Sequence, residues 1–278
     1  MKIFIIIMLL SQSTMNNISL AKQHFIATKI GKISTYIYEI PSAETPIIFL
    51  HGVYFDHHLW DEVIRKIEGR TILTIDMPLH GESRNNIKPD WTLEDCGDML
   101  IEILDSLKIP NVIAIGHSWG SMTILRSASK HPERFVSIGL CNMPFQAASK
   151  KQKAIFGLQH PMLTFRSFYT RQAAKALFGK TSLKENPSLI NELKRPMNLL
   201  TNNQIKQTDR AVIVNADDVT ELISNLKVKA IALKGKEDYV PSPPGIDTTI
   251  VKGGHISPIE NSNAVIEFVK RILIKTEE

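Results

Sequence analysis

Short apolar runs rich in Ile and Leu alternate with longer amphipathic segments along most of this 278-residue chain. The clearest runs occupy residues 46–50, 71–75, 111–115 and 135–140. The clearest amphipathic segment spans residues 92–107, where Thr92 and Asp95 have the spacing of a helix capping box. Strands that alternate with helices need crossover connections, which make neighbouring strands parallel. We therefore predict an α/β fold built on a mostly parallel sheet.

The alternation begins with a predicted hairpin over residues 25–40 and is interrupted once. Residues 146–227 lose the strand pattern and consist of short helical segments, after which strands return and a helix over residues 257–274 completes the pattern. A helical insertion between two strands of one sheet is expected to cover the edge of that sheet. We therefore predict a core formed by residues 22–145 and 228–278, with a helical cap formed by residues 146–227.

Composition places the chain among globular proteins and excludes disorder, because 43% of the residues are hydrophobic and 22% are charged. Two cysteines, Cys96 and Cys141, cannot build a disulfide scaffold or a four-cysteine zinc site. Both fall within predicted core elements, so we expect two buried thiols; a disulfide between them, which an exported protein would permit, is the alternative. The formal charge is +5, with Lys and Arg present throughout the chain. This distribution favours a solvated surface over a nucleic-acid-binding one.

The first 21 residues differ from the rest of the chain. Lys2 is their only charge, residues 3–10 form a continuous apolar run, and Ser19 and Ala21 place small residues near a possible cleavage point. This is the layout of a secretory signal peptide. The apolar run is much shorter than the roughly 20 residues that a membrane-spanning helix needs. We therefore expect export to a periplasm or to the medium without a membrane anchor; a buried N-terminal element is the alternative.

The segment Gly116-His117-Ser118-Trp119-Gly120 carries the strongest chemical signal, because it lies between a predicted strand and a predicted helix. A nucleophilic hydroxyl must stand clear of the sheet, and a sharp strand-to-helix turn achieves this only when small residues flank the nucleophile. The N-terminus of the helix also presents backbone N–H groups to a developing oxyanion. The pattern predicts Ser118 as a nucleophile and the backbone of Trp119 as one oxyanion donor.

A second oxyanion donor is expected from the loop that follows residues 46–50. His51-Gly52 opens this loop, and the backbone N–H of Val53 comes next. An acyl-transfer enzyme needs two such donors aimed at the oxyanion. We assign this role to Val53 and give His51 a packing role.

Asp238 and His255 each follow a predicted strand of the second half of the sheet. A carboxylate at the first position can orient a histidine, with Glu237 as the competing acid, and the glycines before His255 let its ring reach inward. A single histidine is more often structural. The order of glycine loop, serine, aspartate and histidine nevertheless favours a Ser-His-Asp triad formed by Ser118, His255 and Asp238.

These motifs make the chain similar to α/β-hydrolases over nearly its whole length after residue 21. The segment Asp76-Met77-Pro78-Leu79-His80-Gly81-Glu82-Ser83 resembles the Asp-x-Pro-Gly-x-Gly-x-Ser loop of that family, and His131-Pro132-Glu133-Arg134 resembles a segment common after its nucleophile helix. Three positions depart from the family pattern: Leu79 and Ser121 stand where Gly is usual, and Asn261 stands where Pro is common.

The resemblance implies a mostly parallel eight-stranded sheet flanked by helices, with an inserted helical cap. It also implies that Ser118 attacks an acyl carbonyl, that His255 serves as general base and then acid, and that Asp238 orients it. No cofactor is implied. A serine at the nucleophile position excludes the dehalogenase and epoxide-hydrolase branches of the fold, which carry aspartate there.

An acyl pocket is expected between the carboxyl edge of the sheet and the cap. We expect substrate contacts from Phe55, Met143 and Phe145, which lie near the predicted loops. For the aromatic residues of the cap, packing on the core is an equally good interpretation; these are Phe156, Phe165, Phe168 and Tyr169, with Met162 beside them.

Two charged segments are interpreted as solvated surface and not as binding sites. Asp56-His57-His58 could suggest a metal, but adjacent histidines lack the spacing of a ligand pair on a helix and no third ligand is evident. A solvated N-cap at Asp56 is favoured, and no metal is expected. Lys150, Lys151 and Lys153 predict a solvated face, with contact to a membrane surface as the lesser alternative.

Hydrolysis of a small or medium ester is the predicted activity. A carbon–carbon bond hydrolase with the same triad is one rival, and a proline-iminopeptidase-like enzyme is another, suggested by Gly-x-Ser-Trp-Gly-Ser. An aminopeptidase needs acids in its cap to hold the substrate amine, whereas this cap has few, chiefly Glu185 and Glu192. A ligand-binding protein without catalysis is the alternative from another class, although it would not need all three triad residues. We expect a small-molecule partner and no nucleic acid.

Overall fold

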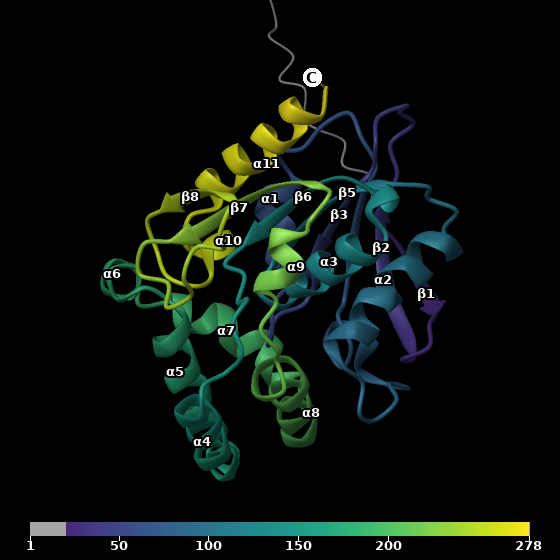
Figure 1. Ribbon diagram of the computed structural model, residues 1–278. Helices are drawn as coiled ribbons and strands as arrows, with labels where there is room; N and C mark the ends of the chain where they lie inside the picture. The colour runs from purple at the N-terminus through teal and green to yellow at the C-terminus, as the bar shows by residue number, and fades with distance from the viewer. Residues whose placement is uncertain (1–20, 278) are drawn as a thin grey trace, which may run out of the picture.

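An eight-stranded sheet forms the centre of the molecule in a computed structural model that describes residues 21–277 (Figure 1). The strand order is β1-β2-β4-β3-β5-β6-β7-β8. The strands are β1 (Lys22–Ala27), β2 (Lys32–Tyr38), β3 (Ile47–Leu50), β4 (Ile72–Ile75), β5 (Val112–His117), β6 (Phe135–Cys141), β7 (Lys229–Gly235) and β8 (Asp247–Val251). β2 is antiparallel to both β1 and β4, and the remaining neighbours are parallel. The predicted mostly parallel α/β sheet is confirmed.

The central strands are buried on both faces, as crossover helices require. Every residue of β3, β4 and β5 is buried. Helices α2 (Leu93–Ser106) and α3 (Trp119–Lys130) pack on one another beside the sheet, and α1 (Asp61–Ile64) and α11 (Ser262–Glu277) form a second packed pair. The helices leave the carboxyl ends of the parallel strands free to carry functional loops.

Helix boundaries follow local chemistry. α2 begins with the predicted capping box, in which Thr92 accepts from the backbone of Asp95 and the Asp95 carboxylate accepts from the backbone of Thr92. The predicted helix over residues 257–274 is wrong in one respect, because it is two helices, α10 (Ser257–Glu260) and α11. Asn261 separates them with φ −152° and ψ 60°, outside the helical region.

The chain between β6 and β7 is helical and lies below the sheet in Figure 1. It contains α4 (Lys150–Gln159), the 3-10 turn η4 (His160–Thr164), α5 (Arg166–Leu177), α6 (Lys180–Glu185), α7 (Leu189–Asn198), α8 (Asn202–Thr208), the π-helical turn η5 (Asp209–Val214) and α9 (Thr220–Ser224). We call residues 146–227 the cap.

Both cysteines are buried and unpaired, as predicted: Cys96 lies in α2 and Cys141 ends β6. Burial raises the pKa of both thiols well above the ordinary range. Across residues 21–277, no helix combines the length and the apolar character needed to cross a bilayer. The predicted export signal covers residues 1–21 and lies outside the described residues except for Ala21.

Candidate active site

Ser118 occupies a strained turn between β5 and α3. Its φ of 50° and ψ of −111° place it in the left-handed half of backbone space, where a residue with a side chain is uncommon. A Cβ on Gly116 would collide with the backbone N of Ser121, and a Cβ on Gly120 would collide with the carbonyl O of Leu50. The turn therefore requires both glycines, as the sequence pattern predicted, and it holds Ser118 at the edge of the sheet.

The structure brings Ser118, His255 and Asp238 into one hydrogen-bonded chain. The Ser118 hydroxyl lies 2.9 Å from Nε2 of His255, and Nδ1 of the same ring lies 2.9 Å from Oδ1 of Asp238. All three side chains are buried. Burial raises the pKa of the Asp238 carboxyl, but hydrogen bonds from His255 and other donors outweigh burial and lower it below its ordinary value. Asp238 therefore stays ionised and holds a proton on Nδ1 of His255.

The loop that carries His255 is anchored to the cap. The backbone N–H of His255 donates to the carbonyl of Leu177 over 2.7 Å. The Glu260 carboxylate accepts from the N–H groups of Gly254 and Gly179, both at 2.8 Å. One carboxylate thus joins the histidine loop of the core to the end of α5, so the cap and the histidine are positioned together.

Asn142 completes the support of Asp238 and was missed by sequence reasoning. Its Nδ2 donates to Oδ2 of Asp238 over 2.8 Å and lies 3.2 Å from the carbonyl O of Gly254. The backbone N–H of Val240 donates to Oδ1 of Asp238 over 3.1 Å. The only sequence signal for Asn142 is a polar residue two positions after the predicted strand 135–140. The competing acid Glu237 is exposed and accepts instead from the backbone of the cap.

Two backbone N–H groups beside Ser118 are available to a ligand. Those of Val53 and Trp119 donate to no acceptor within residues 21–277. Val53 lines the same cavity as Ser118. The loop passes so close that a Cβ on Gly52 would lie 3.1 Å from Cβ of Ser118. The arrangement offers two donors to an oxygen held next to the serine hydroxyl.

His51 has a structural place in the same loop. Its Nδ1 donates to the carbonyl of Gly52 over 2.7 Å, so its Nε2 accepts from the backbone N–H of Met77 over 2.9 Å. The ring is completely buried, and burial lowers its pKa. His51 is therefore a neutral residue that ties the loop carrying Val53 to the loop after β4.

A cavity of about 740 Å³ lies between the core loops and the cap. Its lining includes Val53, Tyr54, Ser118, Pro144, Gln146, Ile155, Phe156, Met162, Phe168 and Tyr169. Phe55, Met143 and Phe145, from which the sequence predicted substrate contacts, are not among the residues that line this cavity. These three side chains are buried in the core; Phe55, for example, packs edge-on against His117. Their apolar area is buried beneath the loops, and the neighbours Tyr54, Pro144 and Gln146 face the cavity instead.

The buried carboxylate of Asp209 joins the cap to the wall of the cavity. Tyr54 donates to Oδ1 over 2.5 Å, Tyr169 donates to Oδ2 over 3.2 Å, and Nε2 of His160 donates to Oδ2 over 3.0 Å. Tyr54 follows Val53 in the core loop, whereas the other two donors belong to the cap. Tyr54 and Tyr169 line the cavity, whereas Asp209 does not. The Asp209 carboxylate therefore fixes the orientation of two polar side chains in the cavity wall.

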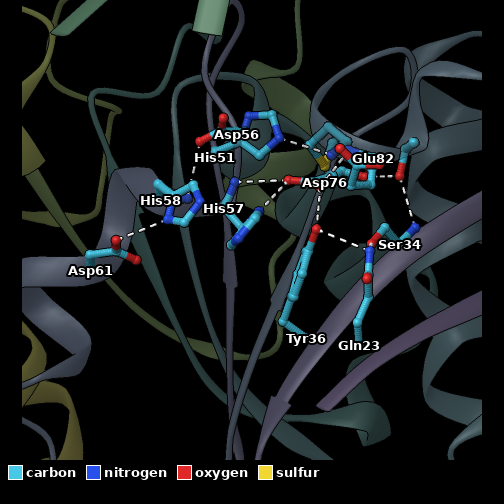
Figure 2. Close-up of polar contacts among 12 residues, drawn as sticks. Gln23, Ser34, Tyr36, His51, Asp56, His57, His58, Asp61, Asp76 and Glu82 are labelled. Atoms are coloured by element: carbon cyan, nitrogen blue, oxygen red, sulfur yellow. Dashed lines mark hydrogen bonds and ion pairs between the residues drawn. The ribbon is translucent and has the colours of Figure 1, made fainter. Parts of the chain in front are cut away.

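Asp56 is a second link between the cap and the core. It is the predicted N-cap, accepting from the backbone of His58 at the start of the 3-10 turn η1 (His57–Trp60). The prediction that it is solvated is wrong, because its carboxylate is buried in a bidentate pair with Arg195 of α7, at 2.9 and 3.0 Å. The neighbouring histidines pair with Asp76 and Asp61 (Figure 2), and within residues 21–277 no cluster of three or more His, Cys, Asp or Glu could hold a metal ion.

Comparison with known proteins agrees with this architecture. The family model of the alpha/beta hydrolase fold matches residues 45–211. The chain belongs to the α/β-hydrolase family. A curated relative, the sn-1-specific diacylglycerol lipase ABHD11 of Xenopus tropicalis, is 29% identical over 41% of this chain and 37% of its own length. The chain spans only about a third of the length of this relative and of other curated relatives that it matches.

Two solved structures share the fold of this α/β-hydrolase. An esterase from Thermogutta terrifontis superposes with a TM-score of 0.80 at 18% identity, covering 93% of this chain and 100% of the other. The enol-lactonase from Burkholderia xenovorans LB400 superposes with a TM-score of 0.78 at 18% identity, covering 90% and 100%. At such identities the likeness shows the fold alone.

The departures from the α/β-hydrolase pattern are accommodated locally. Leu79 adopts φ 69°, which explains why Gly is usual at this position. Ser121 is buried, and its hydroxyl lies 2.7 Å from the carbonyl O of Gly116 and 3.1 Å from that of Cys141, so it braces the turn of Ser118. Asn261 ends α10. None of the three residues lines the cavity.

Proposed function

We propose that this α/β-hydrolase cleaves a carboxylic ester through an acyl-enzyme formed on Ser118. The observation that carries the proposal is the pair of 2.9 Å contacts that His255 makes with Ser118 and with Asp238. Nε2 accepts the hydroxyl proton as Oγ attacks the acyl carbonyl, and Asp238 stabilises the resulting imidazolium. The N–H groups of Val53 and Trp119 hold the oxyanion. The imidazolium then protonates the leaving alcohol, and a water activated by His255 releases the acid.

The cavity supports a neutral or anionic acyl substrate of moderate size. Its lining is mainly apolar, and within the described part of the chain the only charged side chain that lines it is Lys175. No acid lines it: Glu185 pairs with Lys252 at the surface, and Asp209 lies behind Tyr54 and Tyr169. An aminopeptidase would need such an acid for the substrate amine, so this wall argues against the iminopeptidase alternative. The Xenopus relative is named a lipase, which agrees with an ester substrate.

The test is hydrolysis of p-nitrophenyl esters of graded acyl length by wild type, Ser118→Ala and Ser224→Ala. Ser224 is an exposed serine of α9 and serves as the matched control. We expect turnover that Ser118→Ala reduces by a factor of at least about 10³ and that Ser224→Ala leaves unchanged. Equal turnover by wild type and Ser118→Ala would refute the mechanism.

A fluorophosphonate probe separates this proposal from its rivals. A competent triad labels Ser118 irreversibly, whereas a ligand-binding protein without catalysis leaves it unlabelled. Labelling without hydrolysis of any ester would instead favour the carbon–carbon bond hydrolase. Absence of labelling in folded wild-type protein would refute the enzyme assignment itself.

We also propose that residues 1–21 direct export and are then removed. In support, the proposed cleavage point lies directly before β1, which begins at Lys22, so cleavage would leave every described strand and helix intact. Expression of the full chain in a bacterial host, followed by N-terminal sequencing of the periplasmic protein, tests this. A mature N-terminus at Lys22 is expected. Full-length protein confined to the cytoplasm would contradict the proposal.

A further inference from the structure

The positive charge of the chain is concentrated in one part of the cap. Residues 146–184 contain eight Lys and Arg and no Asp or Glu. Because the whole chain has a formal charge of +5, the residues outside this segment together carry −3. Lys and Arg do occur throughout the chain, but this segment holds the largest number of them with no acid between them. The segment therefore generates a local positive field on a molecule that is otherwise slightly acidic.

Most cations of this segment are exposed to solvent; the exception is Arg166, which is half-buried and donates to the carbonyl O of Leu200. Lys150, Lys151 and Lys153 on α4, and Arg171 and Lys175 on α5, are exposed. None of them forms a salt bridge with a residue in the described range 21–277. Helix α4 has no buried residue and lies at the end of the molecule away from the sheet (Figure 1). These charges are thus free to meet an anionic partner.

The same segment exposes large apolar side chains. Of the ten large hydrophobic residues exposed in the described part of the chain, five fall in residues 155–168: Ile155, Leu158, Met162, Phe165 and Phe168. Leu158 and Phe165 are 76% and 69% exposed and do not line the cavity. Exposed apolar groups gathered in one place mark an interaction site more often than scattered ones do.

The charged and apolar groups share a surface. On α4, Lys151, Ile155 and Leu158 follow the spacing that places residues on one side of a helix, whereas Lys153 lies on the other side of this helix, which has no buried residue. We call Lys150, Lys151, Lys153, Leu158 and Phe165 the cap-tip surface. Ile155, Met162 and Phe168 adjoin it and also line the cavity that contains Ser118. The cap-tip surface therefore borders the walls of the candidate active site.

We propose that the cap-tip surface docks on an anionic lipid bilayer. Lysines near such a surface are attracted by its negative potential, and exposed Leu and Phe side chains gain free energy by entering the interfacial region. A phosphate-rich nucleic acid would satisfy the lysines but would leave Leu158 in water. An acidic protein would need a complementary apolar recess, whereas a bilayer adapts to any apolar shape. Docking would also place Ile155, Met162 and Phe168, and so the cavity, against a source of acyl lipids.

The test is binding of the full chain to vesicles, which needs no catalysis and is therefore independent of the proposed hydrolysis. Co-sedimentation is measured with phosphatidylcholine vesicles containing about 30 mol% phosphatidylglycerol and with pure phosphatidylcholine vesicles. It is repeated at about 0.1 M and about 1 M salt, where the Debye length falls from about 10 Å to about 3 Å. We expect binding to anionic vesicles at low salt, and little binding to neutral vesicles or at high salt.

Matched variants separate the cap-tip surface from general effects of charge and hydrophobicity. Reversing Lys150, Lys151 and Lys153 to Glu should weaken binding by at least about a hundredfold, since each lysine near an anionic surface contributes about fivefold. The control reverses three exposed core lysines by the same total charge: Lys66, Lys88 and Lys108. We expect this control to weaken binding by less than about tenfold.

A second pair of variants tests the contribution of the exposed apolar side chains to vesicle binding. Leu158→Gln with Phe165→Gln should weaken binding by more than about tenfold, because both side chains lose their burial in the interface. The control is Phe25→Gln with Ile250→Gln, two exposed residues on the edge strands β1 and β8. Circular dichroism establishes that each variant is folded.

Three outcomes would overturn the proposal. Equal binding to neutral and anionic vesicles would remove the electrostatic basis. Equal losses of vesicle binding in the cap-tip and core lysine variants would show that binding does not depend on the cap-tip surface. Binding of the wild-type chain to duplex DNA but not to anionic vesicles would replace the lipid by a nucleic acid.

Discussion

The Asp76 carboxylate is the clearest place to test the electrostatics of this fold. It is fully buried and accepts from His57 Nδ1 at 2.8 Å, Tyr36 at 3.0 Å, and the backbone N–H groups of His57 and Glu82 at 2.9 and 2.8 Å (Figure 2). Burial by itself would raise the pKa of this carboxyl. The hydrogen bonds and the charge of His57 outweigh burial and lower the pKa from 3.8 to about 2.

This lowered pKa implies a stability that depends on pH. A depression from 3.8 to about 2 corresponds to about 2 kcal/mol in the free energy of unfolding. Because the folded pKa lies below the unfolded one, this contribution is complete well above pH 3.8 and is lost as the pH falls through about 2. About half of it is gone near pH 3. Asp76→Asn removes the titrating group, so its deficit relative to wild type should shrink as the pH falls.

The assay is urea unfolding of wild type and Asp76→Asn between about pH 6 and about pH 3. We expect the difference in unfolding free energy to fall by about 1 kcal/mol over that range. The prediction concerns how this difference changes with pH and not its absolute value at one pH. Glu267→Gln, which removes an exposed ion pair with Lys270, is the control and should change by less than about 0.5 kcal/mol. A difference for Asp76→Asn that stays constant from pH 6 to pH 3 would refute the reasoning.

Two further predictions concern packing and buried charge. Gly120→Ala should destabilise the protein by at least about 2 kcal/mol, because the new Cβ would collide with the carbonyl O of Leu50. As a control, Gly157→Ala in α4 places a Cβ that meets nothing within 4 Å and should stabilise the protein by about 0.5–1 kcal/mol. Equal changes in the free energy of unfolding for the two variants, measured in urea, would contradict this prediction. Tyr54→Phe removes the 2.5 Å donor to the buried Asp209 carboxylate and should cost about 1–3 kcal/mol in the same assay. A loss below about 0.5 kcal/mol would show that Tyr169 and His160 satisfy that carboxylate without it.

The residues Ser118, Asp238 and His255 could be located from the sequence because each follows a strand of a parallel sheet. The carboxyl ends of such strands meet at one edge, so residues 120 and 17 positions apart were expected to converge. Asn142 also follows a strand, yet it was missed. Its place depends on φ 51° and on a 2.8 Å contact with a carboxylate 96 positions away, neither of which leaves a mark in the local pattern.

The walls of the cavity could not be predicted for a different physical reason. Sequence reasoning selected Phe55, Met143 and Phe145 because large apolar residues near strand ends are good candidates for contact with an acyl chain. The same apolar area makes these residues the ones that folding buries most strongly, and each is at most 6% exposed. Strand alternation no longer decides the direction of a side chain once the chain turns through the left-handed region, as it does at Tyr54 with φ 68° and at Asn142. Other side chains that are just as buried, such as Tyr54 and Tyr169, do line the cavity. The wall of this pocket is therefore poorly ranked by hydrophobicity, even though the polar residues at the strand ends could be located from the sequence.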